Sequence, residues 1–237
     1  MKRNRTAWIF TFYSLNDLQS ILPKIHAEDI IIAVDSGIEL LLKKMIKPHY
    51  FIGDFDSVSV DSLKKVEQND TIEIVQLKRE KDETDAEIAV DFCINKGFEE
   101  ICLVNSLQER FDHSLGVLSA LENAFERGVQ LRIISALQEV FLAKKVQELD
   151  YPVDTIFSLC PLTEVVSSVK TINCLYPLNH EHLFRQKTRG ISNIISKNRA
   201  QISFNEGKLL VIVQLNIEHT HLYTGTSINE QLNMPIA

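Results

Sequence analysis

The stretch IIIAVDSGIELLLKKMIKPHYFIGDFD, residues 30–56, indicates the fold class of this chain. It opens with an uninterrupted apolar run at 30–34, which is typical of a strand buried on both faces. A helical pattern follows at 37–46, and a second apolar run at 50–52 leads into Gly53 and two aspartates. A strand, a helix and a strand joined by short connections predict a parallel unit of an α/β sheet.

The same alternation continues on both sides of this stretch. Further strands are predicted at 7–13, 71–77, 100–106 and 129–135, and further helices at 15–25, 60–69, 84–97 and 112–128. After about residue 137 only strand-like runs divided by Pro, Asn and Gly remain, and Asn205–Gly207 is a hairpin signal. We therefore predict a doubly wound, mostly parallel sheet with helices on both faces in residues 1–137. An antiparallel β-sandwich is predicted in residues 138–237.

Composition excludes several classes of function. The chain has 237 residues, 45% of them hydrophobic and 24% charged, with a net charge of −7. Such an acidic chain has no general basic field for nucleic acid, and no apolar stretch reaches the roughly 18–20 residues that span a membrane. The four cysteines match no zinc or redox spacing, which favours free thiols in a reducing, cytoplasmic setting.

Aspartates collect where the predicted strands of the first half end. Asp35 follows the run at 30–34, Asp54 and Asp56 follow the run at 50–52, and further aspartates follow the next two strands at positions 82, 85 and 112. Taken singly, Asp35, Thr84 and Asp112 could each cap a helix. Taken together on one sheet edge, the carboxylates repel unless a cation neutralises them or some of them stay protonated. Carboxylate oxygens and water are the ligands that Mg²⁺ prefers, so the pattern indicates a Mg²⁺ site at this edge.

Groups suited to phosphate lie at the same predicted edge. Gly37 and Gly53 allow close approach of a ligand, and helix N-termini near residues 37, 85 and 113 present free amides. Lys81 and Arg110 could bind phosphate oxygens, Arg110 in a bidentate manner. Neither the P-loop nor the dinucleotide-binding glycine pattern is present. Phe55, between Asp54 and Asp56, is expected to point away from them and to pin the loop.

The motifs DSG (35–37), GDFDSV (53–58), KDETDAEIAV (81–90) and RFDHSLGVL (110–118) resemble, in order and spacing, those of thiamine pyrophosphokinases. GISN (190–193) and QISFNEGKLLVIV (201–213) resemble the C-terminal motifs of the same family, so that the resemblance spans about residues 7–215. It implies transfer of the β,γ-pyrophosphoryl group of ATP to the hydroxyl of thiamine, which gives thiamine diphosphate and AMP. It also implies Mg²⁺ and a homodimer with thiamine at the subunit interface.

The resemblance also implies roles for individual residues. The implied catalytic residues are Asp54, Asp56, Thr84 and Asp85, and the implied metal ligands are Asp35, Asp54, Asp56 and Asp85. The ATP site comprises Asp35, Ser36, Gly37, Lys81, Asp82, Arg110, Asp112 and His113. Ser192 and Asn193 face thiamine. Asp54, Asp56 and Asp85 are alternative acceptors for the hydroxyl proton, and Tyr176 and Phe184 are among the aromatic candidates for contact with thiamine.

The chain also departs from the family pattern. Ser36 stands in place of a glycine, Gln108 and Glu109 replace the glycine pair before Arg110, Asn105 stands where glycine is common, and Ile194 replaces an acidic residue. These changes leave open weaker ATP affinity or another nucleotide preference. Two alternative functions also remain open: a non-catalytic protein that binds thiamine or a nucleotide, and a pyrophosphokinase for another hydroxylated heterocycle such as a pterin.

Overall fold

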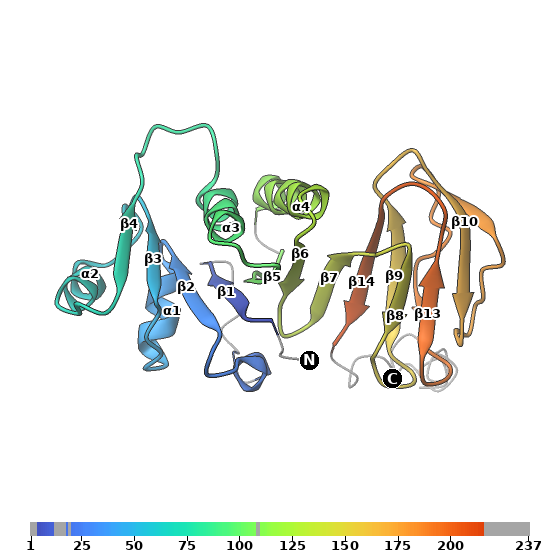
Figure 1. Cartoon of the computed structure of the whole chain (residues 1–237), viewed down its shortest axis with the longest axis horizontal. Coiled ribbons are helices and arrows are strands. Elements are labelled where there is room, and N and C mark those ends of the chain that lie inside the picture. Colours follow the sequence, from blue (N-terminus) through green and yellow to red (C-terminus); the bar gives the residue numbers. More distant parts are fainter. Residues whose placement is uncertain (1–3, 12–17, 19, 108–109, 216–237) are drawn as a thin grey trace, which may run out of the picture. The chain divides into compact units, whose positions relative to one another are not determined.

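The computed structural model describes residues 4–11, 18, 20–107 and 110–215. The chain forms two compact units, residues 1–136 and residues 137–237, which are coloured from blue to green and from yellow-green to red in Figure 1. Among the described residues, no helix combines the length and the apolar character needed to cross a membrane. All four cysteines are free, and three of them are buried.

The first unit contains a parallel sheet of six strands in the order β6-β5-β1-β2-β3-β4. Every neighbouring pair in this order runs parallel. The strands are β1 (Thr6–Phe10), β2 (Ile30–Val34), β3 (Tyr50–Gly53), β4 (Glu73–Gln76), β5 (Glu100–Val104) and β6 (Gln130–Ile134). Strands β2, β3 and β4 follow β1 toward one edge of the sheet, whereas β5 and β6 lie on the other side of β1. A gap between the connections therefore opens beyond the carboxyl ends of β1 and β5.

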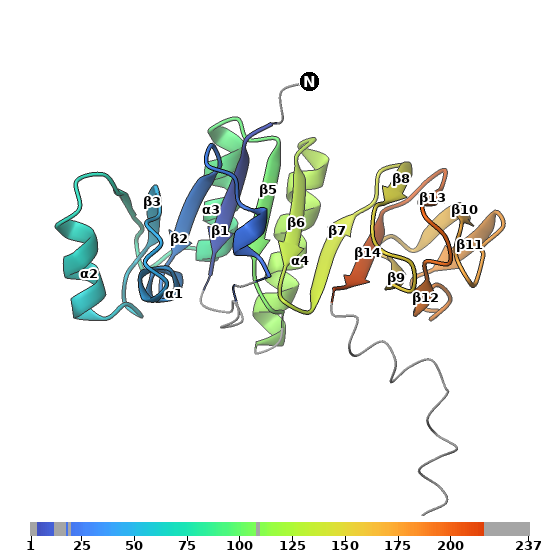
Figure 2. The ribbon, with the colours of Figure 1, turned by 90° about the horizontal axis from the view of Figure 1, so that it is seen from below.

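Helices cover both faces of this sheet, as the sequence predicted. They are α1 (Gly37–Lys43), α2 (Val60–Glu67), α3 (Asp85–Asn95) and α4 (Phe111–Glu126). α3 packs against α4 on one face, and α1 lies on the other (Figures 1 and 2). The helix predicted at 15–25 lies partly outside the described residues. Its described part contains only the 3-10 helix η1 (Leu22–Lys24), which has Pro23 in its first turn.

A buried carboxylate fixes the start of the sheet. Asp29 is 2% exposed and precedes β2 directly. Its oxygens accept hydrogen bonds from the Thr6 amide at 3.0 Å, the Trp8 indole at 3.1 Å and the His26 amide at 3.0 Å. Trp8 is 3% exposed, so its indole lies in the core of the first unit. Asp29 thus ties β1 to the segment that leads into β2.

The second unit consists of two antiparallel sheets. One has the order β12-β9-β14-β7 and the other the order β11-β10-β13-β8. The strands are β7 (Gln138–Leu142), β8 (Val146–Leu149), β9 (Ile156–Pro161), β10 (Val165–Ile172), β11 (Glu181–Phe184), β12 (Asn193–Ile194), β13 (Ala200–Ser203) and β14 (Leu209–Gln214). Apolar side chains from both sheets, among them Phe141, Phe157, Val169 and Ile202, form one core. The predicted antiparallel β-sandwich is therefore confirmed.

The predicted hairpin at Asn205–Gly207 is wrong. The flanking strands β13 and β14 belong to different sheets and do not pair with each other. The turn instead packs on β10, because the Asn205 amide donates to the Ser167 carbonyl and the Ser167 amide donates to the Glu206 carbonyl. A turn signal between two strand-like runs does not distinguish a hairpin from a connection that crosses between the layers of a sandwich.

Candidate active site

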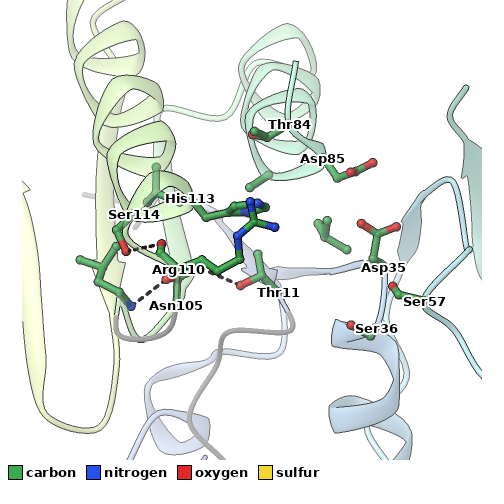
Figure 3. A pocket seen from close by; sticks show the side chains of 14 residues that line it. Thr11, Asp35, Ser36, Ser57, Thr84, Asp85, Asn105, Arg110, His113 and Ser114 are labelled. Atoms are coloured by element: carbon green, nitrogen blue, oxygen red, sulfur yellow. Dashed lines mark hydrogen bonds between the residues drawn. The ribbon is translucent and has the colours of Figure 1, made fainter. Parts of the chain in front are cut away.

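A pocket of about 250 Å³ lies beyond the carboxyl ends of β1, β2 and β5 in the first unit. Figure 3 shows Asp35 and Asp85 on one side of it and Arg110 and His113 on the other. The pocket is lined by Thr11, Val34, Asp35, Ser36, Ser57, Thr84, Asp85, Ala86, Asn105, Leu107, Arg110, His113, Ser114 and Val117. The strand order of the sheet reverses at this point, and open α/β sheets bind ligands at such points.

Asp35 occupies a constrained position directly after β2. Its φ is 46°, in the left-handed region that is uncommon for residues with a side chain. A Cβ atom on the neighbouring Gly53 would lie 2.0 Å from Asp35 Oδ1, so that the Asp35 carboxylate rests in the space that this glycine leaves free. The N-cap of α1 is Ser36, and no side chain caps this helix. Asp35 is therefore held toward the pocket and does not cap α1.

Asp35 and Asp85 form a close pair of like charges. Burial, the charges of Asp85 and Asp54, and hydrogen bonding with Asp85 together raise the pKa of Asp35 to about 7, although the Lys81 ammonium opposes the rise. The buried atom Asp35 Oδ1 has no hydrogen-bond partner among the described groups, whereas Asp85 Oδ1 lies 3.1 Å from the Lys81 ammonium. Two carboxylates in this arrangement are stabilised when a proton or another cation lies between them.

Lys81 provides positive charge beside this pair. Its ammonium lies 3.1 Å from Asp85 Oδ1 and 3.8 Å from Asp54 Oδ2. It also donates a hydrogen bond of 3.1 Å to the Lys78 carbonyl. In the described part of the chain, no three His, Cys, Asp or Glu side chains come together in a way that could hold a metal ion. The predicted four-carboxylate Mg²⁺ site is thus not assembled in this structure, where Lys81 lies between two of its members.

The loop that carries Asp54 and Asp56 has its own internal support. Asp54 Oδ1 accepts a hydrogen bond of 3.1 Å from the Asp56 amide, and the Asp56 side chain itself is exposed. The Phe55 ring stacks on Phe51 with ring centroids 4.4 Å apart, which confirms the expectation that Phe55 points away and pins the loop. The φ of Phe55 is 65°. The loop therefore places Asp54 toward Lys81 and leaves Asp56 at the surface.

Arg110 and His113 lie at the start of α4. Arg110 forms a bidentate ion pair with Asp112, in which Arg110 Nε lies 3.1 Å from Asp112 Oδ1. Hydrogen bonding from the Arg110 guanidinium holds the pKa of Asp112 at about 2. Both side chains are more than half exposed, so the pair contributes little to stability. Arg110 also lines the pocket, and an anion bound there would meet a guanidinium that Asp112 already orients.

Thr11 and Asn105 connect the ends of β1 and β5 by hydrogen bonds. Neither was predicted as a site residue. Thr11 Oγ1 donates to the Val104 carbonyl and accepts a hydrogen bond of 3.0 Å from Asn105 Nδ2. Asn105 Oδ1 accepts a hydrogen bond of 2.9 Å from the Leu107 amide. Asn105, noted above as a departure from the family pattern, is 5% exposed and fixes the start of the loop after β5. Thr11 was missed because it continues an apolar run that reads as strand.

The remaining predicted residues divide between pocket, support and surface. Thr84 lines the pocket and is the N-cap of α3, where its hydroxyl accepts a hydrogen bond of 3.2 Å from the Glu87 amide. Gly37 allows close approach of the protein's own backbone, because a Cβ atom there would lie 2.2 Å from the Phe10 carbonyl oxygen. Asp82 is exposed and is not among the lining residues. Gln108 and Glu109 lie outside the described residues.

The two residues predicted to face thiamine belong to the second unit. Ser192 is exposed, with a φ of 57°. Asn193 is 3% exposed and holds the backbone of Tyr176 from both sides: its Oδ1 accepts from the Tyr176 amide at 3.1 Å, and its Nδ2 donates to the Tyr176 carbonyl at 2.8 Å. The Asn193 side chain thus fixes the chain at Tyr176, whose own side chain is 54% exposed.

Replacing Gly53 with alanine should displace the Asp35 carboxylate without removing any acidic side chain from the site. The new methyl group would overlap Asp35 Oδ1, and Asp35 Cγ lies only 2.9 Å from the same position. We expect nucleotide affinity to fall at least about 10-fold, because misplacement of a site by about 1 Å has costs of this order or larger. Calorimetric titration with an ATP analogue would measure it. Gly97→Ala, at a position with open space, is the control, and unchanged affinity in Gly53→Ala would contradict the account.

The fold and the pocket together define the chain as a two-part protein in which a doubly wound α/β unit with a ligand pocket precedes a β-sandwich. Two family models match it. "Thiamin pyrophosphokinase, catalytic domain" matches residues 23–133, and "Thiamin pyrophosphokinase, vitamin B1 binding domain" matches residues 146–209. The chain therefore belongs to the thiamin pyrophosphokinase family of enzymes.

Individual relatives agree with this assignment. The chain is 29% identical over 185 residues to a thiamine pyrophosphokinase of Bacillus subtilis, covering 76% of this chain and 85% of that protein. The crystal structure of thiamin pyrophosphokinase from Geobacillus thermodenitrificans superposes with a TM-score of 0.79 at 25% identity, covering 89% of this chain and 98% of the other. That of the yeast enzyme superposes with a TM-score of 0.74 at 17% identity, covering 92% and 88% respectively, which shows the shared fold.

Proposed function

We propose that this chain transfers the β,γ-pyrophosphoryl group of ATP to the hydroxyl of thiamine and releases thiamine diphosphate and AMP. The observation that carries the proposal is the pocket at the β1–β5 gap, which places carboxylates on one side and a guanidinium with the N-terminus of α4 on the other. Phosphoryl transfer requires mostly positioning and charge stabilisation, and this pocket offers both. The family membership of both parts of the chain supports the same reaction.

ATP would bind with its phosphates over the gap. The first-turn amides of α3 and α4 are suited to phosphate oxygens, and the side chains of Arg110 and His113 line the same space. Ser36 and Ser57 add hydroxyl groups on the opposite side. We expect Lys81 and Asp112 to act at the margin of this site, since neither lines the pocket and each contacts a residue that does.

The carboxylates on the first side suit a magnesium ion. Asp35 presents a buried oxygen that has no hydrogen-bond partner among the described groups. The Lys81 ammonium lies between Asp85 Oδ1, at 3.1 Å, and Asp54 Oδ2, at 3.8 Å. Oxygen ligands of this kind are those that Mg²⁺ prefers. We propose Asp35, Asp54 and Asp85 as its protein ligands, with Asp56 as a further ligand only if the exposed loop moves. A bound Mg²⁺ would neutralise charge on the phosphate oxygens.

The hydroxyl proton of thiamine needs an acceptor near the pocket. Of the three alternatives that the sequence left open, only Asp85 lines the pocket. Asp54 Oδ1 already accepts a hydrogen bond from the Asp56 amide, and the Asp56 side chain is exposed. We therefore propose Asp85 as the proton acceptor, because a general base must come within hydrogen-bond reach of the group that it deprotonates.

We propose that thiamine contacts the second unit at the segment that holds Ser192 and Tyr176. Asn193 uses its side-chain amide on the Tyr176 backbone, so its contribution is to position that segment. The half-exposed Tyr176 ring is suited to the cationic thiazolium ring of thiamine. The homodimer with thiamine at its interface, and the cytoplasmic location, are proposals that follow from the family resemblance.

The proposed reaction can be tested by its products. Purified protein with ATP, Mg²⁺ and thiamine should form AMP and thiamine diphosphate in equal amounts, measured by chromatography. A panel with hydroxymethylpterin and other hydroxylated heterocycles should give no transfer. Formation of ADP in place of AMP, or transfer to a pterin alone, would contradict the proposal. Thiamine binding without turnover would indicate the non-catalytic alternative.

A further inference from the structure

The Lys81 ammonium lies between Asp54 and Asp85, where a metal ion bound to these two carboxylates would also lie. The ammonium contacts three oxygens: Asp85 Oδ1 at 3.1 Å, the Lys78 carbonyl at 3.1 Å and Asp54 Oδ2 at 3.8 Å. The side chains involved are largely buried, with exposed fractions of 14% for Lys81, 13% for Asp54 and 24% for Asp85. An ammonium group surrounded by oxygens in this way is a counter-ion for the carboxylates, and a lysine is more often found at the surface.

We propose that Lys81 is an exchangeable counter-ion. In the ligand-free protein its ammonium balances Asp54 and Asp85, and it leaves them for the phosphates when a divalent cation and nucleotide enter. This inference rests on the proposed function for the identity of the incoming ligand. It assigns Lys81 a second role, as the group that competes with the metal until the nucleotide arrives.

Electrostatics requires the two cations to exclude each other. A divalent ion bound to Asp54 and Asp85 would lie within a few ångströms of the Lys81 ammonium, where repulsion between cations is large in a partly buried site. The negative triphosphate of a nucleotide would give the displaced ammonium a new partner. Free metal should therefore bind weakly, and metal together with nucleotide should bind well.

The local structure allows this movement. Lys81 lies in the segment between the end of β4 at Gln76 and the start of α3 at Asp85, which has no helix or strand. Two of its three contacts are ion pairs made by a flexible four-carbon side chain, and the third is a single hydrogen bond to the Lys78 carbonyl. The side chain can leave these oxygens by rotating its own bonds. Asp54 and Asp85 are anchored separately, by the Asp56 amide and by α3.

The test compares metal binding with and without nucleotide in a Lys81→Met variant, which keeps the length of the side chain and removes its charge. Manganese serves as the probe for Mg²⁺ and is measured by electron paramagnetic resonance. Without nucleotide, Lys81→Met should bind Mn²⁺ at least about 10-fold more tightly than the unmodified protein. With a non-hydrolysable ATP analogue and Mg²⁺, the variant should bind the analogue at least about 10-fold more weakly.

The opposite signs of the two changes distinguish this role from others. Lys78→Met is the matched control, because Lys78 contributes its backbone carbonyl, and it should change neither affinity by more than about twofold. Lys81→Arg should restore weak binding of free Mn²⁺. If free Mn²⁺ binds to Lys81→Met no more tightly than to the unmodified protein, or binds to neither, the counter-ion role is wrong. Absence of AMP formation would contradict the proposed function but would not affect the conclusion drawn from Mn²⁺ binding.

Discussion

An Asp54→Asn variant is expected to lose about three orders of magnitude in turnover while keeping its folding stability. The amide oxygen of asparagine can still accept the hydrogen bond that the Asp56 amide now donates to Asp54 Oδ1. The substitution removes one negative charge from a site where Asp54 raises the pKa of Asp35. A thousandfold loss corresponds to about 4 kcal/mol of transition-state stabilisation, which is of the size found for single electrostatic groups.

The measurement combines steady-state rates with thermal melts in EDTA. The melting temperature of Asp54→Asn should stay within about 2 °C of the unmodified protein, because relief of charge repulsion offsets the weaker contact with Lys81. Asp61→Asn is the control, since this carboxylate is 77% exposed and pairs only with the exposed Lys65 in the contacts described here. A melting temperature lowered by more than about 5 °C would show that Asp54 is mainly a structural residue.

Asp29→Ala is expected to destabilise the first unit by about 3–5 kcal/mol. The change leaves the Thr6 amide, the Trp8 indole and the His26 amide without the carboxylate that accepts their hydrogen bonds. Asp29 is 2% exposed, so water cannot replace the lost acceptor without rearrangement. Loss of one buried, charged partner typically has a cost in this range.

Urea denaturation followed by tryptophan fluorescence measures this effect directly. Trp8 is the only tryptophan of the chain and donates to Asp29, so its emission reports on the first unit. Asp61→Ala, which removes an exposed carboxylate, should change the free energy of unfolding by less than about 0.5 kcal/mol. A loss below about 1 kcal/mol for Asp29→Ala would show that the three donors find other acceptors.

The fold class could be predicted because its signals are local and repeated. Apolar runs followed by amphipathic segments indicate parallel strands and helices wherever they occur. The strand predicted at 30–34 and the helices predicted at 84–97 and 112–128 correspond in this way to β2, α3 and α4. The connection at Asn205–Gly207 was not predicted correctly, because the sheet that a strand joins depends on contacts with distant residues such as Ser167. Local turn chemistry carries no information about that choice.

The candidate site could be predicted only in part, for a similar reason. The aspartates at strand ends were visible because the geometry of a parallel sheet brings strand ends together, and the structure places Asp35 and Asp85 side by side. Charge and residue type do not reveal whether a lysine lies between the carboxylates, as Lys81 does. Nor could they indicate that Asn193 would use its amide on Tyr176, or that Asn105 would join Thr11.

The most direct test of the account is a crystal structure of the protein with Mg²⁺, a non-hydrolysable ATP analogue and thiamine. The account predicts the triphosphate in the pocket beyond β1 and β5, with Arg110 on one side of it and a metal ion bound by Asp35 and Asp85 on the other. It predicts the thiamine hydroxyl within hydrogen-bond reach of Asp85. A nucleotide bound elsewhere on the chain, with this pocket unoccupied, would contradict the central claim.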